Sequence, residues 1–169
     1  MPVTHVNRYH DTFYLHVGWT KNGKPRYWFS TKADGDLVDA IPDDYEIYEN
    51  PDARIYLRKK PLQIVTPEEV AVVKEGVKRY APDQHCIVDV RKEDIIVYHS
   101  KRGSLYQKML RFTLDDKQDR TFRVQRWCFK RSIDDWIDLS MLGRLVGELP
   151  VLVQKICPHL GRDSFNDLM

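Results

Sequence analysis

The side chains best suited to metal binding or acid–base chemistry are six histidines and three cysteines, and they are scattered along the chain. His5, His10 and His16 lie at intervals of five and six residues, which neither one helix face nor one strand face can hold. Cys157-Pro158-His159 comes nearest to a metal half-site, but it lacks the paired Cys-x-x-Cys or His-x-x-x-His spacing of zinc motifs. The sequence therefore predicts no metal site and no cofactor.

Motifs for nucleotide binding or nucleophilic catalysis are also missing from the sequence. There is no Gly-x-Gly-x-x-Gly stretch, no Walker loop and no Gly-x-Ser-x-Gly elbow, and the chain has only eight glycines. We therefore expect a non-catalytic protein. A small hydrolase or nuclease stays an alternative, and it requires His10, His16 or His99 to converge with aspartates in one pocket.

The clearest candidate for a binding surface is a basic block in the C-terminal half. From Lys101 to Arg131 there are ten basic and three acidic residues, a local net charge of +7, with aromatic residues between them. Arginines on a strand beside aromatic rings can bind phosphates and stack on bases. The candidate residues for binding a polyanion or a protein partner are Arg111, Arg120, Arg123, Arg126, Trp127, Lys130 and Arg131.

An acidic segment of the same chain offers a second interpretation of these arginines. From Ala33 to Ala53 there are eight acidic residues and no basic one. Arg123 and Arg126 have opposite parity, so a regular strand directs them to opposite faces. The arginines either pair with the acidic segment within or between chains, form a polyanion surface, or remain solvated. We favour the pairing.

Composition is typical of a globular protein. The chain has 169 residues, of which 42% are hydrophobic and 31% charged, with a net charge of +2. An odd number of distant cysteines fits a reducing compartment. The N-terminus lacks a signal-peptide pattern, and no apolar run is long enough to cross a bilayer. We expect a cytoplasmic protein with no membrane partner.

One helix is strongly specified by the stretch Val65-Thr66-Pro67-Glu68-Glu69-Val70. Thr66 is a good N-cap, proline suits the first helical position, and Glu69 completes a capping box. Val70, Val73, Val77 and Tyr80 give the helix one apolar face, and Pro82 ends it.

Four β-hairpins are predicted around this helix. The first pairs Phe13–Trp19 with Arg26–Ser30 through Asn22-Gly23, the best short signal for a two-residue type I′ turn, with Val17 opposite Trp28. The other three pair 45–48 with 54–58, 86–90 with 95–99, and 109–114 with 121–129.

The C-terminal part is predicted to be helical. Ser132 is placed as the N-cap of a helix with Ile133, Trp136 and Ile137 on its apolar face. A further helical stretch begins near Met141, and Pro150 either kinks or restarts it.

The predicted fold class is therefore α+β, with four antiparallel hairpins in a mixed or mainly antiparallel sheet around a central helix, and a helical C-terminal part. A boundary near 59–61 would separate an N-terminal two-hairpin subdomain (1–60) from the main part (61–169), and one continuous domain is equally compatible. We expect an interaction module that binds protein, including a second copy of itself, through charged and aromatic hairpin surfaces. Nucleic-acid binding by the basic block is the alternative.

Overall fold

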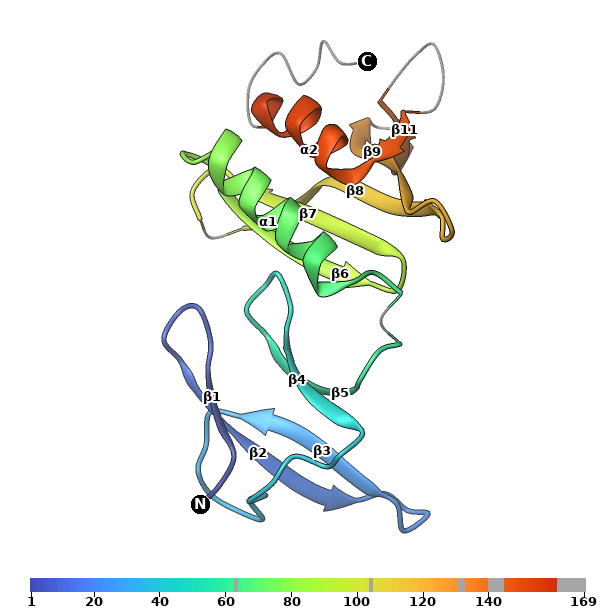
Figure 1. Ribbon diagram of the computed structural model, residues 1–169. Coiled ribbons are helices and arrows are strands. Elements are labelled where there is room, and N and C mark those ends of the chain that lie inside the picture. The colour runs from blue at the N-terminus through green and yellow to red at the C-terminus, as the bar shows by residue number, and fades with distance from the viewer. Residues whose placement is uncertain (63, 104, 131–132, 140–144, 161–169) are drawn as a thin grey trace. The chain divides into compact units, whose positions relative to one another are not determined.

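The computed structural model describes residues 1–62, 64–103, 105–130, 133–139 and 145–160. The chain divides after Pro61 into two compact units, each with its own sheet structure. The fold is α+β, and these described residues contain antiparallel strands in three sheets and two α-helices, one of them C-terminal (Figure 1). No helix in the described part of the chain has the length and apolarity needed to cross a lipid bilayer.

The N-terminal unit consists of two small antiparallel sheets. Strands β1 (Thr4–Val6), β2 (Thr12–Trp19) and β3 (Pro25–Ser30) form the first, in the order β1-β2-β3, and β4 (Tyr45–Glu49) and β5 (Ile55–Lys59) form the second. Strand β3 contacts β5, which brings the two sheets together within the unit. Leu15, Ala53 and Ile55 are buried there.

The first hairpin forms, but its predicted turn and register are wrong. Val17 lies opposite Tyr27, and the chain turns through Lys21, Asn22 and Gly23. Only Gly23 has a positive φ, 71°, where a type I′ turn needs two such residues. The side chain and backbone of Thr20 both bond to the backbone of Lys24, so the loop has three residues instead of two and closes with a glycine bulge.

The β4–β5 hairpin has the same turn, with Ala53 in the glycine position. The amide of Ala53 donates to the Asn50 carbonyl at 3.0 Å, and Ala53 has a φ of 60°. The Asn50 side chain holds the loop, since its Oδ1 accepts from the amides of Asp52 and Arg54. Ala53 is therefore the strained residue of this loop.

Replacing Ala53 by glycine should raise the free energy of unfolding by about 0.5–1 kcal/mol, because glycine adopts positive φ without a steric penalty. Urea denaturation of the full chain measures the change. Gly23→Ala is the reverse substitution and serves as the control. It should destabilise by a similar amount through its positive φ alone, since nothing lies within 4 Å of the added methyl group. A loss of stability in the Ala53 variant would show that packing of its buried methyl group outweighs the strain.

The C-terminal unit is built on one six-stranded antiparallel sheet. Its strands are β6 (His85–Arg91), β7 (Asp94–Ser100), β8 (Gln107–Asp116), β9 (Thr121–Lys130) and β10 (Ile133–Asp138), joined in sequence order. The short β11 (Val146–Glu148) pairs with the start of β9, beyond the part paired with β10. The predicted hairpins β6–β7 and β8–β9 are confirmed.

Two helices, α1 (Pro67–Tyr80) and α2 (Leu149–Ile156), lie on one face of this sheet and contact each other (Figure 1). The capping box of α1 is confirmed, because Thr66 Oγ1 accepts from the Glu69 amide and Glu69 Oε2 accepts from the Thr66 amide. Between helices and sheet lies the main core, which includes Val73, Val97, Leu110, Phe112, Phe122, Val124, Leu152 and Ile156.

The helix predicted after Ser132 is wrong, because residues 133–138 form strand β10. Trp136 lies opposite Trp127, and Asp138 lies opposite Gln125. Strand β9 is ten residues long, and β11 pairs only with its first three residues. The later residues of β9 have backbone groups along the same edge that need partners, and β10 supplies them. Ser132 and Met141 lie outside the described residues. A C-terminal helix does form, and Pro150 stands in its first turn rather than at a kink.

Candidate functional site

The sheet face that turns away from α1 and α2 carries aromatic and charged side chains. Along β9, Phe122 and Val124 belong to the core, so Arg123 and Gln125 point to the opposite side. Hydrogen bonds connect Gln125 with Arg111 on β8 and with Asp138 on β10. We call this surface the polar face; it comprises Asp94, Lys108, Arg111, Thr113, Arg123, Gln125, Trp127, Trp136 and Asp138.

A hydrogen-bonded chain runs across four strands of the polar face. Thr113 Oγ1 donates to Asp94 Oδ1 at 2.6 Å, and the other oxygen of Asp94 lies 3.8 Å from Arg111 Nη1. Arg111 also donates from Nε and Nη2 to Gln125 Oε1, and Gln125 Nε2 donates to Asp138 at 3.0 Å. These bonds fix the side chains in place before any ligand arrives.

Two tryptophans lie beside this chain. The rings of Trp127 and Trp136 meet edge to face, with centroids 5.0 Å apart and planes at 80°. Lys108 Nζ lies 4.0 Å from the Trp127 centroid, and Arg111 Cζ lies 4.7 Å from that of Trp136. All four side chains are partly exposed. The result is a compact aromatic cluster with a cation on each ring.

The predicted site residues separate into different environments. Arg111, Arg123 and Trp127 lie on the polar face, whereas Arg126 has the opposite parity and is only 7% exposed. The side chain of Lys130 and all of Arg131 lie outside the described residues.

Arg120 joins the β8–β9 turn to the start of α1. Its Nε donates to Glu69 Oε1 at 2.8 Å, and its Nη2 donates to the Ile64 carbonyl. Glu69 thus serves both the capping box and this ion pair.

Carboxylates of the acidic segment have partners in the N-terminal unit. Glu46 binds Arg58 at 2.8 Å, and Glu49 binds Arg8 at 2.6 Å. Burial raises the pKa of Glu49, but the hydrogen bonds and positive charge of Arg8 outweigh it and leave the pKa below its ordinary value. The arginines Arg111 and Arg120 likewise have acidic partners, Asp94 and Glu69, in their own unit.

Two of the histidines that the hydrolase alternative requires have hydrogen-bonding neighbours within their own units. His16 stacks on Trp28 in the N-terminal unit, and its Nε2 lies 3.0 Å from the Lys32 carbonyl. His99, in the C-terminal unit, lies 2.7 Å from the Gln84 side-chain oxygen. Among the described residues, no three His, Cys, Asp or Glu side chains are grouped to hold a metal ion.

His99 should make the stability of the C-terminal unit depend on pH. Burial lowers the pKa of His99 below 6.5, and the charges of His85 and Lys101 lower it further. The unfolded chain therefore takes up this proton first as the pH falls. Stability contributed by neutral His99 is complete above pH 6.5 and is lost below it.

Between about pH 7.5 and about pH 5.5, the free energy of unfolding should fall less in His99→Gln than in the wild type. Urea denaturation at each pH measures the difference, and His10→Gln, an exposed histidine, should keep the wild-type slope. Parallel curves for His99→Gln and the wild type would contradict this account.

Sequence reasoning missed six of the nine polar-face residues, namely Asp94, Lys108, Thr113, Gln125, Trp136 and Asp138. In the sequence, Trp127 comes four residues before Arg131 and Trp136 comes four residues after Ser132. A hairpin with a two-residue turn at 131–132 would therefore place the two tryptophans opposite each other. That symmetry was the available signal for Trp136. Lys108 and Asp94 come from other strands and depend on the register of the whole sheet.

Comparisons of the chain with protein-family models, curated proteins and solved structures gave no significant match. The functional argument therefore depends on the residues of this chain.

Proposed function

We propose that this protein is an interaction module whose polar face binds a protein surface, namely the same face of a second copy of the chain. The observation that carries the proposal is the partly exposed Trp127–Trp136 pair with Lys108 and Arg111 on its rings. Tryptophan and arginine are the residues most enriched among interface hot spots. Here they are clustered and already held in place.

The pattern of charge favours a second copy as the partner. Lys108, Arg111 and Arg123 provide three positive charges, and Asp94 and Asp138 lie among them on the same face. A two-fold interface brings each patch against itself, so a surface that holds both signs can complement its own copy. A phosphate backbone placed on this face would meet the two carboxylates as well as the cations.

Sedimentation of the full chain over a range of concentrations tests this proposal. We expect a reversible dimer, and Trp136→Ser should raise its dissociation constant by about tenfold or more. Trp19→Ser is the matched control, because Trp19 is 73% exposed and lies in the N-terminal unit. A wild-type protein that stays monomeric throughout, or an equal effect of both substitutions, would overturn the proposal.

Binding of single-stranded nucleic acid is the second candidate, and Arg123 is the observation that favours it. Arg123 is partly exposed and its Nε has no hydrogen-bond partner among the described residues, so its guanidinium is available to a phosphate. If the polar face binds an oligonucleotide, affinity falls steeply with salt, and Arg123→Ala lowers the log–log salt slope by about 1. We expect negligible binding instead, because of the neighbouring carboxylates. Tight, salt-sensitive binding would favour this second candidate.

A further inference from the structure

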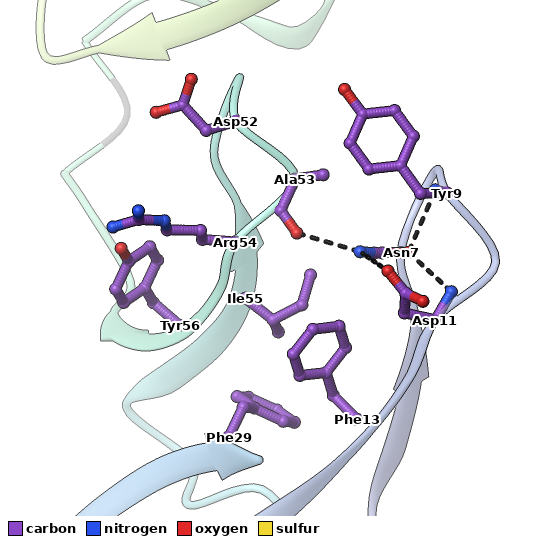
Figure 2. Close-up of a pocket in the computed structure, with 10 residues that line it drawn as sticks. All are labelled: Asn7, Tyr9, Asp11, Phe13, Phe29, Asp52, Ala53, Arg54, Ile55 and Tyr56. Carbon is purple, nitrogen blue, oxygen red and sulfur yellow. Dashed lines mark hydrogen bonds between the residues drawn. The ribbon is translucent and has the colours of Figure 1, made fainter. Parts of the chain in front are cut away.

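A pocket of about 400 Å³ lies within the N-terminal unit, between the β1–β2 connection, β3 and the β4–β5 hairpin (Figure 2). Phe13, Phe29 and Ile55 provide apolar side chains on one side of it, and Tyr9 and Tyr56 are both 44% exposed at its margin. A concave site with an apolar floor and a few polar groups at its rim is the usual form of a small-ligand site.

Asn7 joins the two walls of this pocket. Its Nδ2 donates to the Ala53 carbonyl at 3.2 Å, and its Oδ1 accepts from the amides of Tyr9 and Asp11 (Figure 2). Asn7 itself is only 5% exposed. The bonds hold the β1–β2 connection against the β4–β5 hairpin, so the pocket is formed in advance of a ligand.

Arg8 strengthens the same junction. Its Nη2 donates to the Asn50 carbonyl at 2.6 Å and its Nη1 to the Pro51 carbonyl at 3.1 Å. Its Nε donates to Glu49. A preorganised site loses less free energy to ordering when a ligand binds.

The charges and rings of the lining indicate which ligand fits. Asp11 and Asp52 contribute two carboxylates, and Arg54 contributes one guanidinium. Asp52, Arg54 and Tyr56 are exposed, and Figure 2 shows all three side chains directed away from Tyr9 and Asp11. The rings of Tyr9, Phe13 and Phe29 therefore share the pocket with the carboxylate of Asp11, the combination that attracts organic cations.

We propose that this pocket binds an alkylammonium group on an apolar stem, as in a lysine side chain with a methylated amine. The stem contacts Phe13, Phe29 and Ile55, the aromatic rings attract the cation, and Asp11 balances its charge. This site is separate from the polar face, and the proposal does not depend on dimer formation.

Titration of the full chain with N-acetyl-Nε-trimethyl-lysine methylamide, followed by NMR, tests the site. We expect fast-exchange shifts of amides lining the pocket. The neutral Nε-acetyl-lysine analogue should bind at least about fivefold more weakly, because it lacks the positive charge that the rings and the carboxylate attract. Equal binding of the neutral analogue, or no shift at millimolar ligand, would overturn the proposal.

Charge variants make the test sharper. Asp11→Asn should weaken binding of the trimethyl-lysine probe by roughly two- to fivefold, and Arg54→Gln should strengthen it slightly by removing a nearby positive charge. Asp34→Asn is the control for general charge, since Asp34 is exposed and is not among the lining residues. The reverse order, in which Arg54→Gln weakens binding and Asp11→Asn strengthens it, would show an anion site. Trp136→Ser should leave the affinity of the probe unchanged, which separates this test from that of the polar face.

Discussion

Replacing Gly76 with alanine should lower the free energy of unfolding of the C-terminal unit by about 1–3 kcal/mol, although alanine is the better helix former. Gly76 is buried in α1, and a Cβ added there would lie 2.0 Å from Val153 Cγ1 of α2. The helices would have to move apart, and the core between them would lose its packing.

A second variant separates this clash from a general effect of the substitution. In a Val153→Ala background the space is free, so Gly76→Ala should cost much less there, and the two changes should be strongly non-additive. Gly147→Ala is the control, because its new methyl group would meet Leu152 at an ordinary 3.9 Å. Additive effects, or a Gly76→Ala protein as stable as the wild type, would contradict the described contact of α1 with α2.

Loss of the Glu69 side chain should have the second largest effect. Glu69→Ala removes half of the capping box and the partner of Arg120 together, so we expect a destabilisation of about 2 kcal/mol. Glu69→Gln separates the two roles, because glutamine can still complete a capping box but cannot form the ion pair. It should cost about 1 kcal/mol or less.

Thermal and urea denaturation measure these differences, and Thr66→Ala should cost about 1 kcal/mol through the cap. Glu68→Gln is the control, because Glu68 is an exposed acid in the same helical turn. If Glu69→Gln were as damaging as Glu69→Ala, the ion pair with Arg120 would account for the whole effect and the cap for none.

The parts of the fold that the sequence predicted are those determined by neighbouring residues. Six consecutive residues contain all the signals for the start of α1, and the β6–β7 and β8–β9 hairpins need only local alternation and a short turn. The prediction of a two-residue turn at Asn22-Gly23 was wrong because the side chain of Thr20, two residues before Asn22, closes the loop by bonding to the backbone of Lys24. The prediction of a helix at residues 133–138 was wrong because pairing of β10 with β9 overrides a weak helical pattern in the sequence.

The candidate site was predicted only in part, for the same reason. Parity along one strand correctly separated Arg123 from Arg126, since that needs no knowledge of the rest of the fold. Sequence could not show that Arg120 binds Glu69, which is 51 residues away. The pocket of the N-terminal unit was also missed, because Asn7 and Ala53 meet only after the two small sheets have packed.

The central claim, that the polar face complements its own copy, is tested most directly by mixing two charge variants. Lys108→Glu/Arg123→Glu makes the face predominantly acidic, and Asp138→Lys makes it predominantly basic. Each variant alone should dimerise more weakly than the wild type, because like charges then meet across the two-fold axis. Sedimentation of an equimolar mixture should show a heterodimer tighter than either homodimer. A mixture that associates no more tightly than the separate variants would contradict the account.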